Sequence, residues 1–232
     1  MALPEIVSIQ EYEVAREHLL AKEKAATHAL DALAAERRRL PMVKYEKEYV
    51  FDTPAGKSTL LELFAGGRQL IVYQFMDLGP DRYCPGCTSY TDNTDVATGR
   101  TVLHQRDTSY VTVSDMPLSQ IETYKKERGW SVPFYSSRGT TFSDDTGAGG
   151  GFLLSVFLRD DDDVYRTYYT RGRGVDRLKF DANMFDLTPL GRQQDWEESP
   201  GHTRTWRRSS ASSREIERLT SDTNRRGAVA AR

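Results

Sequence analysis

The first forty residues place apolar side chains at the spacing of one face of an α-helix. Apolar residues recur at Tyr12, Ala15 and Leu19, and again further along at Ala26, Leu30 and Leu33. The pattern Ser-x-x-Glu at Ser8 and Glu11 is a capping box, and Pro41 ends the stretch. The period predicts an amphipathic helix packed on its own domain or on a second subunit. A helix lying on a membrane surface fits less well, because Glu is mixed with Lys and Arg on the polar face.

Beyond Pro41 the apolar runs become shorter and take the form of strands separated by helices. Residues 69–75 form a nearly continuous apolar, β-branched and aromatic run, which predicts a central strand covered on both faces. Residues 45–51 and 57–60 flank a Pro-Gly turn and predict a β-hairpin. Residues 61–64 predict one helical turn. Further strands are predicted at residues 108–114, 131–136, 152–158 and 164–169, and helices at 85–98 (stopped by Gly99), 117–128 (closed by Gly129) and 175–187.

The alternation of strands and helices predicts an α/β sheet, with a terminal hairpin adding antiparallel strands. Residues 137–151, rich in Gly, Ser, Thr and Asp, predict a mobile loop, and the acid run 160–163 a solvated turn. From residue 199 on, Ser, Arg, Gly and Thr dominate and large aliphatic residues nearly vanish, which predicts a disordered tail. We therefore expect a helical extension over residues 1–41, one domain over 42–198 and a disordered tail over 199–232.

Composition and charge narrow the function classes. The net charge of −2 argues against a general attraction to nucleic acid or to anionic lipid, although the tail carries a local excess of Arg. The first ten residues lack the apolar segment of a signal peptide, and no apolar run is long enough to span a bilayer. We therefore expect a cytoplasmic protein. The two cysteines would lie in a reducing compartment, which favours a catalytic, redox-sensing or metal-binding role over a permanent disulfide.

The motif Cys84-Pro85-Gly86-Cys87 is the one clear chemical feature of the sequence. It follows the predicted central strand and opens a predicted helix, and a helix N-terminus lowers the pKa of a thiol. Proline suits an early helical position because its missing N–H would have no partner there. We therefore expect Cys84 to attack a substrate disulfide and Cys87, one turn further, to resolve the mixed disulfide.

Other chemistry finds less support in the sequence. A structural zinc site needs four ligands, but there is a single C-x-x-C, and His18, His28, His104 and His202 lack paired ligand spacing. The Gly-rich residues 147–151 lack the Lys-Ser/Thr ending of a phosphate-binding loop. We therefore expect no metal and no cofactor. A cysteine pair with no chemical task remains open. Arg82 and Tyr83 flank the motif, and Arg82 could stabilise a thiolate, bind an acidic substrate or be an exposed loop cation.

Several segments together resemble a known bacterial family, the thioredoxin-like proteins catalogued as domain of unknown function 899 and labelled as predicted dithiol-disulfide oxidoreductases. Matching segments occur in the same order over about residues 1–200. They are HALDALAAERRRLPMVKYEKEYVF (28–51), LIVYQFMDLGPDRYCPGCTSYTDN (70–93), WSVPFYSSRGTTF (130–142), LLSVFLRDDDDVYRTYYTRGRGVD (153–176) and FDLTPLGR (185–192) followed by Asp195-Trp196-Glu197. The resemblance implies a thioredoxin-like three-layer α/β/α sandwich, with the long N-terminal helix and the disordered tail as additions.

The chain also departs from related thioredoxin-fold families. Thioredoxins carry a cis-proline before the strand that faces the cysteine pair, and residues 153–156 contain no proline. Peroxiredoxins carry Thr three residues before the reactive cysteine, where this chain has Asp81. The first departure implies a different mode of substrate docking, and the second weakens a peroxidase interpretation. The tail after Pro200 also departs from the family, which ends in an aromatic, basic segment, and Trp206-Arg207-Arg208 would be a remnant of that segment.

Three hypotheses follow. The chain is a dithiol-disulfide oxidoreductase, a thiol peroxidase using the same cysteines, or a non-catalytic thioredoxin-fold protein that binds a partner or senses oxidation. The expected partners are a disulfide or thiol substrate and a reductant, with a homodimer also open; we expect neither a membrane nor nucleic acid. Aromatic residues in the predicted elements are expected in the core, with a substrate groove as the alternative, namely Tyr73, Tyr90, Trp130 and Phe134.

Overall fold

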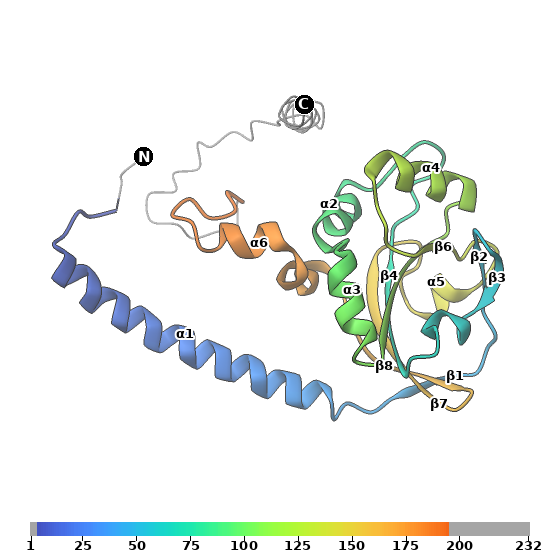
Figure 1. Ribbon diagram of the computed structural model, residues 1–232, viewed down its shortest axis with the longest axis horizontal. Helices are drawn as coiled ribbons and strands as arrows, with labels where there is room; N and C mark the ends of the chain where they lie inside the picture. The colour runs from blue at the N-terminus through green and yellow to red at the C-terminus, as the bar shows by residue number, and fades with distance from the viewer. Residues whose placement is uncertain (1–3, 195–232) are drawn as a thin grey trace, which may run out of the picture. The chain divides into compact units, whose positions relative to one another are not determined.

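A mixed sheet forms the centre of the fold, and its strands follow the apolar runs of the sequence. The structure is a computed structural model and describes residues 4–194. Strand β4 (Gln69–Gln74) lies in the interior of the sheet, parallel to β5 (Thr108–Ser114) and antiparallel to β7 (Leu153–Asp160), as predicted. The remaining strands are β1 (Val43–Tyr45), β2 (Val50–Thr53), β3 (Gly56–Thr59), β6 (Phe134–Ser136) and β8 (Asp163–Thr170). The strands of the sheet follow one another in the order β1-β8-β7-β4-β5-β6-β2-β3. Figure 1 shows the sheet with α2 and α3 beside it.

The helices between the parallel strands begin and end largely where local sequence signals place them. Helices α2 (Pro85–Thr94) and α3 (Ala97–His104) connect β4 to β5, and α4 (Leu118–Arg128) connects β5 to β6. Gly129 ends α4 with a φ of 70°, a left-handed conformation that glycine adopts without strain. Gly99, in contrast, does not stop the helix that follows the cysteine motif. That helix ends at Thr94, and Gly99 lies inside the separate helix α3.

The core of the sheet has the connectivity of a thioredoxin-like fold. Its strand order is β8-β7-β4-β5, with helical crossovers after β4 and an antiparallel hairpin of β7 and β8. Buried side chains of α2 and α4 pack on one face of this sheet, and η1 (Glu62–Phe64) and α5 (Phe142–Asp145) pack on the other. The sandwich of three layers that the resemblance implies is therefore present.

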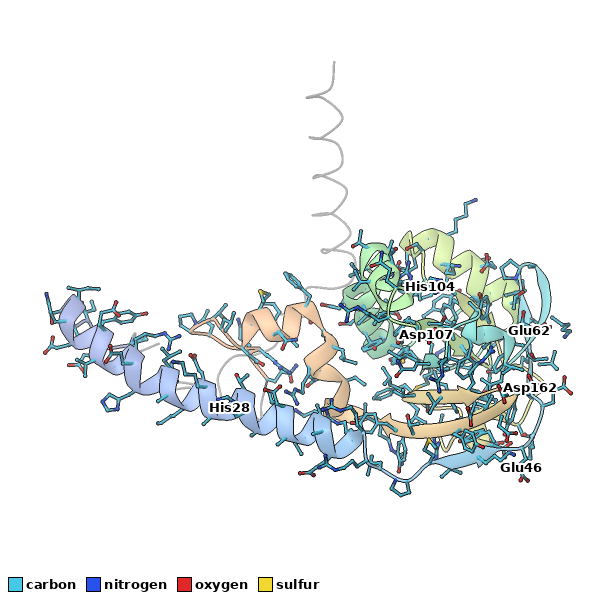
Figure 2. The ribbon with its side chains drawn as sticks, turned by 60° about the horizontal axis from the view of Figure 1, so that its bottom comes forward. His28, Glu46, Glu62, His104, Asp107 and Asp162 are labelled. Carbon is cyan, nitrogen blue, oxygen red and sulfur yellow. The ribbon has the colours of Figure 1, made fainter. Side chains whose placement is uncertain are left out.

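The long N-terminal helix α1 (Ile9–Arg37) begins at the predicted capping box but lacks the predicted apolar face. Ser8 accepts a hydrogen bond from the backbone N–H of Glu11, whose carboxylate in turn accepts from the N–H of Ser8. No residue of α1 is buried, and His28 among them is exposed (Figure 2). The apolar residues do not gather on one face. The C-terminal part of the helix meets the sheet, where the Arg37 guanidinium lies over the Tyr168 ring. Among the described residues, no helix is both long and apolar enough to cross a membrane.

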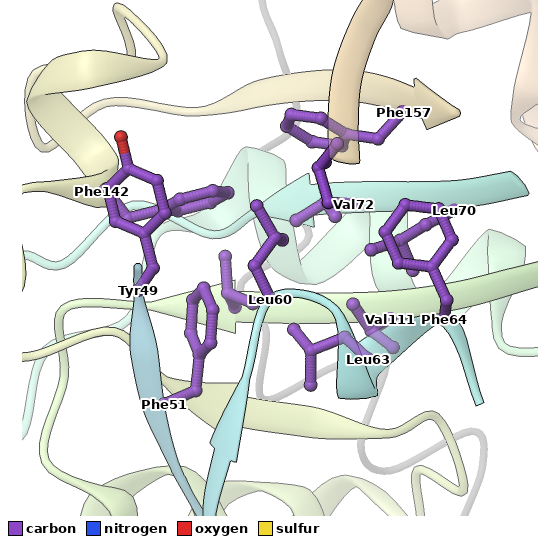
Figure 3. Packing of buried hydrophobic residues seen from close by; sticks show 12 residues of the cluster. Tyr49, Phe51, Leu60, Leu63, Phe64, Leu70, Val72, Val111, Phe142 and Phe157 are labelled. Carbon is purple, nitrogen blue, oxygen red and sulfur yellow. The ribbon is translucent and has the colours of Figure 1, made fainter. Parts of the chain in front are cut away.

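One buried cluster lies beneath the segments that precede β4. The inward-facing residues of β4 and β5, Leu70, Val72, Val111 and Val113, meet aromatic residues from the strand β2 and the helix α5 (Figure 3). Phe142 of α5 stands edge-on to Phe51 of β2, with ring centroids 5.1 Å apart. This cluster contains much of the aromatic surface that the fold removes from water, so it contributes strongly to stability.

Strands β1 and β2 correct the prediction of a single strand over residues 45–51. Strand β1 pairs with β8 at one end of the sheet, while β2 pairs with β6 near the other end. Only residues 46–49 join them, a span of at most roughly 18 Å, whereas six strand spacings in a flat sheet amount to roughly 29 Å. The sheet must therefore curl until its two ends approach each other, with the first buried cluster inside the curl.

The predicted mobile loop at residues 137–151 is instead a packed segment. It contains α5, and Phe142 at the start of that helix has no exposed surface. Asp145 at the end of α5 accepts hydrogen bonds from Tyr49, Lys47 and Thr141, which hold the pKa of its carboxyl at about 2. The glycines of this segment allow tight turns on either side of the buried Phe142. The segment is therefore packed although its composition is that of a loop.

The remaining elements follow the hairpin of β7 and β8. Residues 175–187 were predicted to form one helix, and the structure has η2 (Gly172–Leu178), a 3-10 helix, followed by the short α6 (Phe180–Phe185). Residues 7–184 form one compact unit, and residues 185–194 belong to a second one, in which Arg192 pairs with Asp186. The predicted disordered tail, with Trp206 and its basic neighbours, lies outside the described residues.

Candidate functional site

The cysteine motif lies at the carboxyl end of β4, where the chain changes direction in the sheet. From β4 the chain crosses to β5 on one side, and β7 later returns on the other side. In open α/β sheets, ligands bind at such a switch point because the loops diverge and leave a crevice. The fold therefore places Cys84 and Cys87 beside this switch point, at the carboxyl end of an interior strand.

Cys84 is the N-cap residue of α2, as the sequence predicts. Its backbone is extended, with a φ of −66° and a ψ of 116°, and its Sγ accepts the backbone N–H of Cys87 at 3.4 Å. Pro85 occupies the first helical position. At Gly86, an added Cβ would meet the Cys84 sulfur at 3.9 Å, so glycine keeps that side of the sulfur open. Cys84 is partly exposed and unpaired with Cys87 in this structure.

Cys87 faces the interior, and its thiol is chemically distinct from that of Cys84. Its side chain is 1% exposed. The backbone N–H of Met76 donates to its Sγ at 3.5 Å, and the Tyr73 hydroxyl also bonds to it. Burial outweighs these hydrogen bonds and raises the pKa of Cys87 to about 12. Cys87 is therefore a neutral thiol at neutral pH.

A stacked pair of tyrosines holds the residue just before Cys84 against helix α4. Tyr83, which the sequence placed beside the motif, stacks on Tyr124 of α4 with ring centroids 3.5 Å apart and planes 4° apart. The Tyr124 hydroxyl hydrogen-bonds to Thr88 of α2 at 2.8 Å. Helix α4 also holds the loop before the motif, because the Gln120 amide donates to the Gly79 carbonyl at 3.1 Å. Tyr124 and Gln120 were not among the predicted site residues, since only the tertiary fold brings α4 to the motif.

The other residues of the predicted site lie at the surface of the loop. Arg82 is exposed and forms no ion pair within residues 4–194. Its neighbour Asp81, at the position where peroxiredoxins carry Thr, is also exposed and has a φ of 56°. Arg82 is thus an accessible cation close to Cys84 in sequence, and no contact in the structure draws it to the thiol.

The structure also locates the groups considered for other chemistry. His18 and His28 lie on α1, and His104 is the last residue of α3. Within the described part of the chain, no three His, Cys, Asp or Glu side chains are grouped so that they could hold a metal ion. His202 lies outside that part. All peptide bonds over residues 4–194 are trans. Phe152, just before β7, packs near Tyr73 with ring centroids 6.4 Å apart.

The asymmetry between the two thiols leads to a pH-dependent prediction. With a pKa near 12, Cys87 carries a thiolate fraction of roughly 10⁻⁴ at pH 8, and burial blocks access as well. In the reduced protein we expect iodoacetamide to modify Cys84 first, and Cys87 to react only as the pH approaches 12. Peptide mapping by mass spectrometry at several pH values measures this order. The Cys87→Ser variant serves as the control with a single target thiol. Equal modification of both cysteines at pH 8 would contradict the assignment.

Comparison with known proteins identifies one family. A family model described as "Bacterial protein of unknown function (DUF899)" matches residues 1–212. No curated protein matches the chain in sequence.

Several solved structures are similar at low identity. A peroxidoxin, BcpB, from Mycobacterium tuberculosis is 18% identical, with 60% of this chain and 92% of that chain covered, at a TM-score of 0.40. A secreted disulfide oxidoreductase from the same organism is 10% identical, with coverages of 56% and 90%, at a TM-score of 0.38. A thioredoxin-like protein from Bacteroides caccae is 11% identical, with coverages of 68% and 55%, at a TM-score of 0.41. The fold assignment accordingly stands on the strand order and connections described above.

Proposed function

The chain belongs to the bacterial protein family of unknown function DUF899, and we propose that it is a dithiol-disulfide oxidoreductase. Cys84 is the nucleophile and Cys87 is the resolving thiol. The observation that carries this proposal is the unequal placement of the two sulfurs. Cys84 is partly exposed at a helix N-terminus, while Cys87 is buried one turn further along the same helix.

The reaction consists of two exchange steps. The Cys84 thiolate attacks one sulfur of a substrate disulfide, forming a mixed disulfide and releasing the first substrate thiolate. Cys87 then loses its proton and attacks the Cys84 sulfur, which forms the Cys84–Cys87 disulfide and releases the second substrate thiolate. The two protons of the enzyme thiols end on the released substrate thiols. The substrate gains two electrons, the enzyme loses two, and an external dithiol restores the reduced pair.

The surroundings of the two sulfurs support different roles for Cys84 and Cys87 in the two steps. The backbone N–H of Cys87 donates to the Cys84 sulfur, which holds that sulfur at the first turn of α2. The high pKa of Cys87 keeps the resolving thiol neutral, so it does not compete for the substrate in the first step. Hydrogen bonds from Met76 and Tyr73 are then in place for the Cys87 sulfur when it loses its proton. The stacked Tyr83 and Tyr124 give the loop before Cys84 a rigid support.

A redox titration of the cysteine pair, together with an assay of insulin reduction, tests the proposal. The reduced full-length chain is equilibrated with mixtures of reduced and oxidised glutathione, and the loss of two hydrogens is followed by mass spectrometry. We expect a reversible Cys84–Cys87 disulfide with a midpoint of about −270 to −120 mV, the range of catalytic dithiols. With dithiothreitol as the reductant, the chain should accelerate the reduction of insulin disulfides.

The other outcomes separate the remaining hypotheses. Closure of the pair by hydrogen peroxide much faster than by oxidised glutathione would replace the proposal by a thiol peroxidase. A pair that never closes, or closes without accelerating insulin reduction, would leave a binding or sensing protein. The position of Asp81, exposed and away from the thiol contacts described above, gives the peroxidase hypothesis no support.

A further inference from the structure

A concave site lies on the face of the sheet against which α3 packs, and neither cysteine lines it. It is a cavity of about 680 Å³, within the range of small-molecule binding sites. Its walls come from α3, from the end of α1 and from η2, all within residues 7–184. The cysteine chemistry proposed above uses none of its arginines or aliphatic residues.

The floor of the cavity is one row of side chains across four strands. Pairing places Tyr168 of β8 opposite Val156 of β7, Val156 opposite Ile71 of β4, and Ile71 beside Tyr110 of β5. All four line the cavity. Ile71 and Val156 remain partly exposed although they lie on interior strands, where both faces are normally covered. This part of the sheet face is therefore uncovered apolar surface between two tyrosines.

Glycine helps to keep the space open. Gly99, which was predicted to stop a helix, instead lies in α3 and lines the cavity without a side chain. Gly174 allows η2 to approach β8, since a Cβ there would collide with the Thr170 hydroxyl at 1.9 Å. The cavity thus depends on two positions where a larger residue would change its shape.

The charges around the cavity have one sign. Three arginines line it, and no Asp or Glu does. Arg100 is neutralised by Asp95. Arg37 and Arg177 form no ion pair within residues 4–194, and the Arg37 guanidinium lies over the Tyr168 ring at 5.3 Å, above the apolar floor. Two cations at the wall of an apolar cavity favour a ligand with an apolar body and one anionic group.

We propose that this cavity binds a small organic carboxylate, with its aliphatic or aromatic body on the Ile71–Val156 floor and its carboxylate between Arg37 and Arg177. Guanidinium groups hold carboxylates through paired N–H donors, which gives the site a preference for anions. The apolar floor gives the site a preference for hydrocarbon over sugar-like bodies. The proposal is independent of the redox function, because neither Arg37 nor Arg177 contacts the cysteine pair.

Calorimetric titration of the full-length chain with decanoate and with decylammonium, both below their micelle concentrations, tests the proposal. The two probes share a body and differ in the sign of the head group. We expect decanoate to bind at least ten-fold more tightly than decylammonium. The double variant Arg37→Gln/Arg177→Gln should lose about ten-fold or more in decanoate affinity and should not weaken decylammonium binding, because the charges it removes repel that head group. Arg39→Gln, an exposed arginine of the same segment that does not line the cavity, is the matched control.

A second variant tests the floor. Val156→Phe should raise a ring from the floor where the ligand body would lie and so weaken both probes, and a thermal melt confirms that the variant is folded. Arg37 and Arg177 are both exposed, so the double variant is expected to fold. The arginine test therefore decides the proposal even if Val156→Phe does not fold. Equal affinity for the two probes, no effect of the double variant, or no binding of decanoate would each overturn the proposal.

Discussion

Replacing Cys84 with serine is expected to abolish disulfide reduction, lowering kcat/KM by at least about 10³-fold. Attack on a disulfide requires a thiolate, and a serine hydroxyl has no comparable anion near neutral pH. The replacement should leave the fold intact, because serine is a favoured N-cap residue and can accept the Cys87 N–H that the sulfur now accepts. Insulin reduction and a urea melt of the same preparation measure the two effects.

Cys87→Ser is the matched comparison, because it removes only the second step. This variant should still attack the substrate and then accumulate as a mixed disulfide on Cys84, visible as the added mass of one substrate half. Wild-type turnover by Cys84→Ser, or failure of Cys87→Ser to trap a substrate, would exclude the assigned roles. The two serine variants together distinguish a nucleophile from a resolving thiol, which a single variant cannot do.

Replacing Phe142 with alanine is expected to lower the free energy of unfolding by about 3–5 kcal/mol. The ring has no exposed surface and stands edge-on to both Tyr49 and Phe51, with centroids 5.1 Å away in each case. Its removal leaves a cavity inside the curl of the sheet, which its neighbours can fill only in part. Urea denaturation followed by circular dichroism measures the change.

Phe180→Ala is the control for that experiment, since this ring is 68% exposed and its loss should change stability by less than about 0.5 kcal/mol. A loss below about 1 kcal/mol for Phe142→Ala would mean that residues 137–151 behave as the mobile loop that their composition suggests. The comparison therefore measures directly whether the Gly-rich segment belongs to the core.

The sequence predicted those parts of the fold whose signals are local. The capping box at Ser8, the left-handed end of α4 at Gly129 and the apolar run of β4 were all confirmed, because neighbouring residues decide each of them. The split of residues 45–51 could not be found in this way. The alternation of apolar and polar side chains is the same for one continuous strand as for two strands that pair at opposite ends of the sheet. The partners that separate β1 from β2 are distant in the sequence.

The candidate site shows the same division. The placement of Cys84 as an N-cap follows from the motif, since a cysteine before Pro85 at the end of a buried strand has few alternatives. The contacts of Tyr73 and Met76 with Cys87, and the stacking of Tyr124 on Tyr83, arise from the packing of β4 and α4 against α2. A single sequence carries no signal for such contacts, although the aromatic residue types were expected in the core.

The distant partners of β1 and β2 also determine when the chain can fold during its synthesis. Val43 pairs with Arg166, and Asp52 pairs with Ser136, so both early strands must wait for segments that leave the ribosome much later. At common rates of translation this delay is on the order of ten seconds. During that time β1, β2 and β3 have no sheet to join, and their unpaired edges need protection from other chains. Closure of the curled sheet is therefore expected after most of the chain has been made, as a slow step dominated by long-range pairing.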